Sequence, residues 1–160
     1  GLGDIASYEH ASTGVTVSLA NNSAVGTGDA AGDTFTFINN VRGSSFSDQI
    51  TGNANANILD GGPGGVDQLT GLGGADTFVF HGGHLTITDF NQGSGAVNPA
   101  EGDLIDITAL DGGAHITDAA LNALIAASPG SQLNLGNEDV IDLTGINVHL
   151  NLSAANFIHS

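Results

Sequence analysis

Large apolar residues recur at nearly equal steps through the middle of the chain. Segment 43–79 divides into four blocks, each a glycine-rich turn followed by a short apolar stretch. The eighth position of the blocks is Ile50, Leu59, Leu69 and Phe78, and the sixth is Asp48, Asn57, Asp67 and Asp76. Both series step by nine, ten and nine residues, because the third block carries one extra residue. A fixed short period predicts a solenoid in which each repeat is one rung.

The block length also predicts where the turns lie. Each block offers about six turn residues and three strand residues, so two blocks make one coil and turns alternate between two edges. We therefore expect turns 43–48 and 61–67 to stack on one edge, and turns 52–57 and 71–76 on the other. The apolar series would point inward and form the core.

The flanking residues predict further strands and one helix. Alternation of β-branched and apolar residues indicates strands over 14–19, 33–38, 85–87, 104–107, 140–143 and 148–150. In the second of these, Phe35 and Phe37 would share one face. Residues 91–101 read as an exposed insert. A helix is predicted over 119–125, with Thr117 as N-cap and an end before Pro129.

These elements fit one domain of ordinary size. Residues 1–42 would be an N-terminal flanking β segment, 43–80 the repeats, and 81–160 a C-terminal cap on the open end. The first residues, Gly1 to Asp4, look like the inside of a repeat, so we expect the chain to be part of a longer protein.

The charge balance is extreme. The chain has 17 Asp and Glu residues against one Arg and no Lys, for a net charge of −16. A compact state with this charge repels itself, so the chain either stays disordered or is neutralised by cations. The apolar residues recur in register, which favours neutralisation by cations over disorder. Nucleic acid is excluded as a direct partner, and binding to an anionic membrane is disfavoured. No apolar run reaches transmembrane length, so membrane insertion is not expected.

The repeat chemistry points to calcium. Calcium takes about six to eight oxygen ligands, and glycine turns can direct backbone carbonyl oxygens inward while the sixth residue adds a carboxylate. Cysteine is absent, so no disulfide framework forms. No Cys cluster competes with this oxygen-rich pattern, and zinc and copper are therefore poor fits.

The four blocks resemble the calcium-binding nonapeptide of the repeats-in-toxin (RTX, hemolysin-type) family. They read GSSFSDQIT, GNANANILD, GGPGGVDQLT and GLGGADTFV, and segments 3–19, 74–80, 87–90, 102–106 and 141–158 also look like parts of such proteins. The resemblance implies a mainly all-β fold, a parallel β-roll with several calcium ions in its turns, flanking strands and one short helix in the C-terminal cap.

The family's ligand pattern can be carried onto this chain position by position. It implies a first site of Ser44, Phe46 and Asp48 with Gly61, Pro63 and Asp67, where the extra residue of the third block could shift the register by one. It implies a second site of Asn53, Asn55 and Asn57 with Gly71, Gly73 and Asp76. Further sites would pair Gly62, Gly64 and Asp67, or Leu72, Gly74 and Asp76, with Asp89 or Asp103.

Two departures from the pattern change what we expect. Asn57 stands where the family has aspartate, so the second site should bind calcium more weakly. Phe46 occupies the turn of the first block, which lacks its second glycine, so its loop geometry differs from the pattern.

Other interpretations stay open. The block could be a flexible linker or a metal-free solenoid, and Asp89, Asp103 and Asp106 could be turn caps. His81 and His84 could form a metal pair or be solvated loop residues. No catalytic spacing is present, so we expect no enzyme activity.

Three functional hypotheses follow, and the resemblance adds a secretion route to the first. The first is a calcium-dependent folding and export module, carried by the type I secretion machinery of a Gram-negative bacterium to the extracellular space or cell surface, with the signal in the last ~50 residues by family resemblance. The second is an adhesin or surface-layer module with a polysaccharide or cell-surface partner. The third is a non-catalytic appendage of a secreted protease, lipase or alginate epimerase.

Overall fold

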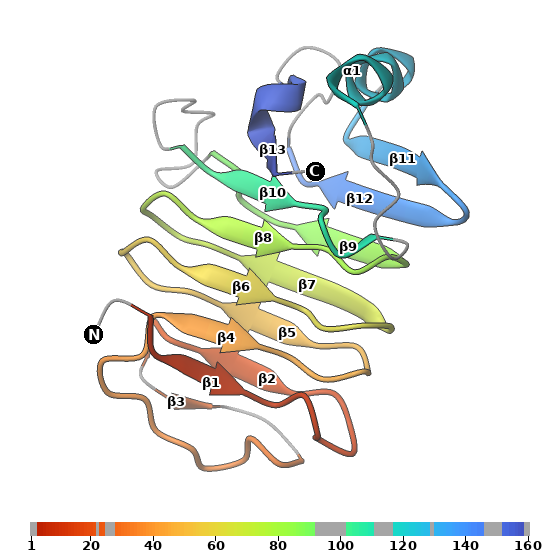
Figure 1. The fold of residues 1–160 in the computed structure, drawn as a ribbon. Coiled ribbons are helices and arrows are strands. Elements are labelled where there is room, and N and C mark those ends of the chain that lie inside the picture. Colours follow the sequence, from red (N-terminus) through yellow and green to blue (C-terminus); the bar gives the residue numbers. More distant parts are fainter. Residues whose placement is uncertain are drawn as a thin grey trace.

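The computed structural model describes residues 3–21, 23–24, 28–91, 102–110, 117–128, 130–145 and 152–158. Two sheets lie face to face in this structure (Figure 1). The six-stranded sheet has the order β1 (Ile5–Ser7), β4 (Asn40–Arg42), β6 (Ile58–Asp60), β8 (Thr77–Val79), β10 (Leu104–Asp106) and β13 (Phe157–Ile158). The seven-stranded sheet has the order β11 (Gln132–Gly136), β12 (Asp139–Leu143), β9 (His84–Ile87), β7 (Val66–Thr70), β5 (Gln49–Thr51), β2 (Thr16–Ser18) and β3 (Ser23–Ala24).

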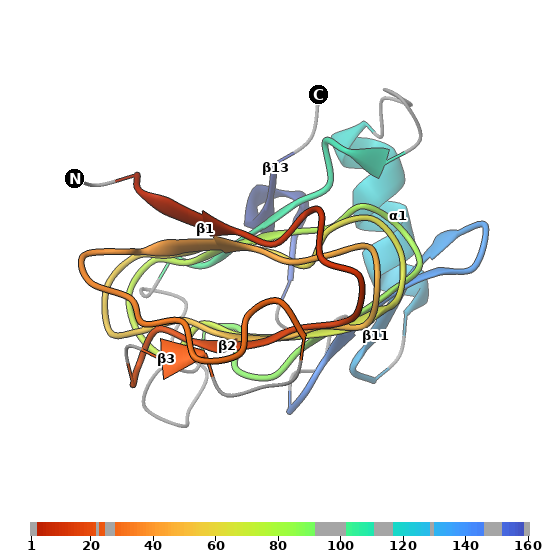
Figure 2. The same ribbon diagram turned by 90° about the horizontal axis from the view of Figure 1, so that it is seen from below.

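Successive strands of the repeats alternate between the two sheets. Ile50 on β5 pairs with Leu69 on β7 in one sheet, and Leu59 on β6 pairs with Phe78 on β8 in the other. All these pairs are parallel, so every connection runs from one sheet to the other around an edge of the molecule. Figure 2 shows the two layers end on, with the connections at both edges.

The expected fold class, a mainly all-β parallel β-roll, is wrong. The structure has two mostly parallel sheets and a helix, α1 (Asp118–Ala127), which is an α/β-like arrangement. β3 pairs antiparallel with β2, and β11 pairs antiparallel with β12. The period could not predict these features because it covers only β5 to β8, and residues outside it follow their own local patterns.

The core lies between the sheets and contains the apolar series of the repeats. Ile50, Leu59, Leu69 and Phe78 are each 1% exposed or less. Neighbouring strands add residues in the same register, so the buried side chains form one continuous cluster. Phe90 extends it, with its ring centroid 6.1 Å from that of Phe78. Full burial of such a side chain stabilises the fold by about 1.5–3 kcal/mol.

Most predicted flanking elements are confirmed within a few residues. Strands β2, β9, β10 and β12 match the predicted segments 14–19, 85–87, 104–107 and 140–143. α1 matches the predicted helix, and the Thr117 hydroxyl accepts the Ala120 N–H at 3.3 Å as the N-cap. The predicted strand 148–150 and all but the first residue of the predicted insert 91–101 lie outside the described residues. No described helix has the length and hydropathy to cross a membrane.

The predicted strand over 33–38 is wrong. This stretch is irregular, with bends at Thr36 and Phe37 and a single bridge residue at Thr34. Phe37 has a φ of 62° and is 84% exposed, whereas Phe35 is buried. The two rings therefore do not share a face, because the left-handed backbone at Phe37 breaks the alternation that their spacing indicated.

The inward position of Leu59 on β6 can be tested by comparison with its neighbour Ile58. Leu59→Ala should lower the free energy of unfolding by about 2–5 kcal/mol, because Leu59 is fully buried and the substitution leaves a cavity. Ile58→Ala on the same strand should cost about 1 kcal/mol, since Ile58 is 47% exposed. Urea unfolding measures both; equal losses would contradict the inward assignment of the apolar series.

Candidate functional site

The turns of the repeats stack on two opposite edges, which we call the first edge and the second edge. On the first edge the turn after β4 lies beside the turn after β6, and the Gly43 N–H donates to the Asp60 carbonyl oxygen at 2.7 Å. On the second edge the turn after β5 lies beside the turn after β7, and the Gly52 N–H donates to the Thr70 carbonyl oxygen at 2.8 Å. The predicted pairing of turns 43–48 with 61–67, and of 52–57 with 71–76, is confirmed.

Buried aspartates form a ladder along the first edge. The Asp67 carboxylate accepts the backbone N–H of Asp48 at 3.0 Å. The Asp48 carboxylate in turn accepts the N–H groups of Val15 and Ser44, each at 2.7 Å. Asp48 is 1% exposed and Asp67 is 7% exposed. Each sixth-position carboxylate therefore fastens its own turn to the preceding one.

The second edge has the same ladder. The Asp76 carboxylate accepts the Asn57 N–H at 2.8 Å, and the Asp103 carboxylate accepts the Asp76 N–H at 2.9 Å. Asp103 also accepts the Asn91 N–H at 2.6 Å. Asn57, Asp76 and Asp103 are each 3% exposed or less. Asp103 thus continues the column of Asn57 and Asp76, although 27 residues separate it from Asp76.

Glycine is required at the first position of the turns because the sixth side chain folds back over it. A Cβ on Gly71 would collide with the Asp76 carboxylate, and a Cβ on Gly52 would collide with the Asn57 carboxamide. A Cβ on Gly43 would lie 2.5 Å from the Asp48 carboxylate. The glycine pattern therefore follows from the packing of these polar side chains against the backbone.

A matched pair of glycines tests this packing. Gly71→Ala should destabilise the fold by about 1–3 kcal/mol, since the new methyl group meets the Asp76 carboxylate and lies 3.1 Å from the Phe78 ring. Gly73→Ala in the same turn meets no atom within 4 Å and should be neutral or stabilise the fold by up to about 1 kcal/mol. Thermal unfolding separates the two, and a harmless Gly71→Ala would refute the packing.

Several backbone oxygens of the expected sites lie where stacked turns meet. On the first edge, the Ser44 and Phe46 carbonyl oxygens approach Gly62 and Gly65, and the Gly61 carbonyl oxygen approaches Gly43. On the second edge, the Asn53 carbonyl oxygen accepts the Gly73 N–H at 3.4 Å, and the Asn55 and Gly71 carbonyl oxygens lie close to Gly74 and Gly52. Pro63 and Gly64 are exposed at the tip of their turn, and Leu72 is 37% exposed.

The extra residue of the third block shifts the register by one, as the sequence allowed. Gly65 approaches the backbone of Phe46, and Gly74 approaches the backbone of Asn55 in the same way. Gly65 is the fifth residue of its block, whereas Gly74 is the fourth. Gly64 and Gly65 both have positive φ angles, of 94° and 78°, which lets the longer turn fit the same space.

The remaining acidic candidates take different places. Asp89 caps the turn after β7, where its carboxylate accepts the N–H groups of Gly71 at 2.9 Å and Leu72 at 2.7 Å. Asp106 accepts the N–H and the hydroxyl of Thr108 and so caps its own turn. Asp103 alone of these three joins the buried ladder.

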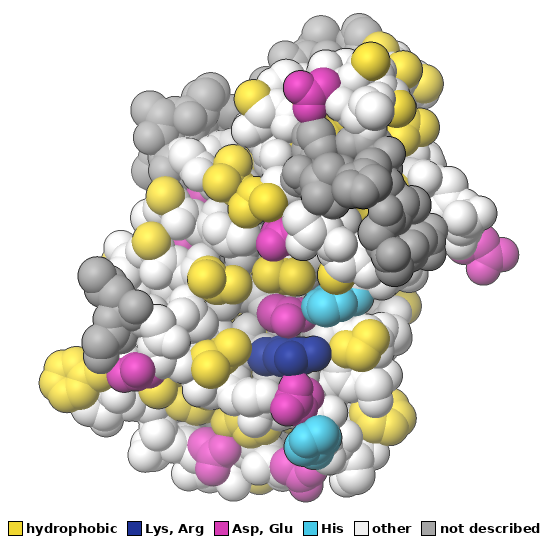
Figure 3. Space-filling model, in the orientation of Figure 1, with side chains coloured by type: hydrophobic (Ala, Val, Ile, Leu, Met, Phe, Trp, Pro, Cys, Tyr) yellow, Lys and Arg dark blue, Asp and Glu magenta, His cyan; other side chains and the backbone are white. Residues whose placement is uncertain are grey.

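The buried carboxylates crowd negative charge at the turns. The chain has one arginine and no lysine, and Arg42 lies beside Glu9 and Asp60 on the six-stranded sheet (Figure 3). Burial raises the pKa of Asp67 from 3.8 to about 7, and the charges of Asp48 and Asp60 add to the rise. The hydrogen bond from the Asp48 N–H and the charge of His81 oppose it. Asp67 therefore keeps its proton to a much higher pH than an exposed carboxylate does.

The Asp67 pKa predicts a pH dependence without metal ions. The folded state holds the Asp67 proton more tightly than the unfolded state, so this contribution to stability falls as the pH rises from about 4 to about 7. In chelator, melting curves followed by circular dichroism should show this fall. Asp67→Asn should remove part of the slope, and Asp29→Asn at an exposed carboxylate should not. An unchanged slope in Asp67→Asn would contradict the assignment.

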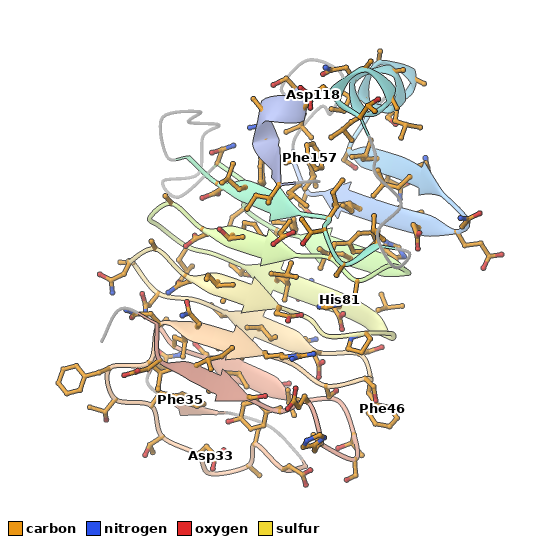
Figure 4. All side chains as sticks on the ribbon, in the orientation of Figure 1. Asp33, Phe35, Phe46, His81, Asp118 and Phe157 are labelled. Carbon is orange, nitrogen blue, oxygen red and sulfur yellow. The ribbon has the colours of Figure 1, made fainter. Side chains whose placement is uncertain are left out.

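The sequence left His81 and His84 open as a metal pair or as solvated loop residues. The ring nitrogen Nε2 of His81, which is labelled in Figure 4, lies 2.8 Å from the Asp60 carboxylate. His84 belongs to strand β9. Among the described residues, no three His, Cys, Asp or Glu side chains gather as a metal site. A cation at the turns would therefore need backbone oxygens as well as carboxylates.

Sequence reasoning missed two parts of the site. Val15 begins the first-edge ladder, but it lies outside the periodic segment and carries no polar side chain to signal its place. Asn91 holds Asp103 through two backbone–side-chain hydrogen bonds, and its only signal was its position at the start of the insert.

Comparison with known proteins adds no assignment: no protein-family model matches this chain, and no curated protein does. The RTX family, secretion route and extracellular location accordingly stay predictions from the repeat pattern.

Proposed function

We propose that this chain is a calcium-binding module whose stacked turns close around calcium ions and thereby stabilise the two-sheet fold. The observation that carries the proposal is the ladder of buried aspartates at glycine turns in a chain with a single arginine. Calcium would supply the positive charge that the side chains of the chain lack.

The cost of burying these carboxylates supports the proposal. A buried carboxylate without compensating charge is destabilising, and hydrogen bonds from backbone N–H groups offset only part of that cost. Arg42 is engaged by Glu9 and Asp60. A divalent cation between two turns would neutralise two carboxylates at once, such as Asp48 with Asp67.

The oxygen donors at the turns favour calcium among the common metals. On the first edge, Asp48, Asp67 and the carbonyl oxygens of Ser44, Phe46 and Gly61 would hold the ion. Carboxylates with several backbone carbonyls suit a hard cation with flexible coordination, whereas magnesium demands near-ideal octahedral geometry and keeps its waters. Zinc and copper prefer nitrogen and sulfur ligands, which these turns do not offer.

The two edges should differ in affinity. The pair Asp48 and Asp67 on the first edge carries two carboxylates, while Asn57 and Asp76 on the second edge carry one. With the same backbone arrangement, the site with less charge binds calcium more weakly. Asp103 beside Asp76 restores two carboxylates one turn further along the second edge.

Calcium would then act on folding by mass action. Extracellular modules bind calcium with dissociation constants of about 0.1–1 mM. At a few mM calcium, each site would add about 1–2 kcal/mol to the stability of the folded state. Several coupled sites could therefore decide whether this polyanion folds.

Calorimetric titration of the chain with calcium tests the proposal. We expect binding of several ions, together with a coil-to-β change in circular dichroism on adding calcium but not magnesium. Asp67→Ala and Asp76→Ala should raise the calcium midpoint, because each removes one carboxylate of a ladder.

Asp29→Ala is the matched control, since Asp29 is exposed and accepts only the Ser12 N–H among the contacts described. Equal midpoints in all three variants would reject the site. Full β structure in chelator that calcium leaves unchanged, with no heat of binding, would reject the function.

A further inference from the structure

Four side chains that are alternately acidic and basic lie across neighbouring strands of the six-stranded sheet. Glu9 follows β1, Arg42 ends β4, Asp60 ends β6 and His81 follows β8. The Glu9 carboxylate lies 2.9 Å from Arg42 Nη1, Arg42 Nε lies 3.6 Å from the Asp60 carboxylate, and the Asp60 carboxylate lies 2.8 Å from His81 Nε2. Figure 3 shows the dark-blue arginine between magenta carboxylates on this face, with a cyan imidazole beside the upper one.

These groups are partly shielded from water. The side chains of Asp60 and His81 are 14% and 19% exposed, and those of Arg42 and Glu9 are 37% and 41% exposed. Arg42 Nε is buried without a hydrogen-bond partner among the described residues, so its attraction to Asp60 is a matter of charge alone. Charges in such a position are screened less by salt than a fully exposed pair.

Asp60 joins this chain of charges to the first edge. The oxygen of Asp60 that contacts His81 also accepts the Gly62 N–H at 2.8 Å. Asp60 therefore holds the beginning of the turn after β6 as well as the imidazole of the turn after β8. Movement of either turn would break one of its contacts.

The charged groups around His81 come from several elements. The hydrogen bond to Asp60 on β6 is the main cause that raises the pKa of His81, and the charges of Asp60 and of Asp106 on β10 act in the same direction. Burial and the charge of Arg42 on β4 lower it. Asp67 on β7 also feels the charge of His81, and at the far end His10 lies 3.6 Å from Glu9.

We propose that Glu9, Arg42, Asp60 and His81 form a charge clasp that ties four strands of the six-stranded sheet together and tightens when His81 takes up a proton. The clasp needs no calcium, so it is independent of the proposed function. It gives the fold a second, acid-favoured source of stability beside the buried ladders.

The direction of the pH effect on stability follows from the contact of His81 with Asp60. Because the folded state favours the protonated imidazole, the clasp contributes fully below the ordinary histidine pKa of 6.5. The contribution is lost as the pH rises through the higher pKa of the folded state. Raising the pH across this range should therefore loosen the clasp.

Two substitutions at His81 separate its charge from its shape. The wild type should lose about 2–4 °C of melting temperature as the pH rises from about 6 to about 8.5, the shift expected for a weak ion pair in a chain of this size. The melting temperature of His81→Gln should lie below that of the wild type at low pH and should fall less as the pH rises. His81→Lys, charged throughout, should keep the higher melting temperature at both ends.

His10→Gln is the matched control, since the His10 side chain is 94% exposed at the end of the clasp. It should follow the wild-type curve. If His81→Gln loses as much as the wild type with rising pH, or if His81→Lys behaves like His81→Gln, the clasp is refuted.

A nuclear magnetic resonance titration measures the pKa of His81 directly. The imidazole signal that disappears in His81→Gln should titrate above 6.5 in the wild type and at a lower pH in Asp60→Asn, which keeps an oxygen for the Gly62 N–H. A wild-type imidazole signal that titrates at or below pH 6.5 would overturn the proposal. Both measurements are made in saturating calcium and in chelator, so a missing calcium response would count against the proposed function and leave the His81 comparison intact.

Discussion

The burial of acidic side chains at stacked turns is the constraint on which the rest of this structure depends. Asp48, Asp67, Asp76 and Asp103 lie almost wholly out of water, and each accepts a backbone N–H from the preceding turn. These contacts set the distance between turns. At Asp48, Asp67 and Asp76, the carboxylate leaves room only for glycine beneath it. They also concentrate negative charge in a chain that has almost no positive charge of its own.

The apolar core and the polar ladders share the work of holding the strands in register. The buried apolar side chains fill the space between the sheets, and this packing requires only an apolar residue at the centre of each short strand. The ladders act at the strand ends, where a shift by one residue would separate the carboxylate from its N–H partner. This division explains why an extra residue in the third block is tolerated at the turn tip, where Gly64 and Gly65 absorb it.

Two electrostatic systems of different kinds meet in the turn after β6. The ladder consists of buried carboxylates that accept backbone N–H groups, whereas the clasp on the sheet surface includes Arg42 and His81. Asp60 belongs to the clasp and caps the turn that ends in Asp67, so the two systems are neighbours in sequence and in space. In this polyanion, the single arginine lies between carboxylates of neighbouring strands.

The sequence by itself determined the features that depend on near neighbours. Its period placed Ile50, Leu59, Leu69 and Phe78 in the core and paired the turns on two edges, and its local signals placed α1 with Thr117 as N-cap. The tertiary structure decided the rest: the two mostly parallel sheets with a helix that overturn the expected fold class, the left-handed backbone at Phe37, the place of Asp103 in the second-edge ladder, and the contact of His81 with Asp60. The physical reason is twofold. The contacts of Asp103 and His81 join groups that are 27 and 21 residues apart in the chain, and Phe37 lies outside the periodic segment, where the period carries no information.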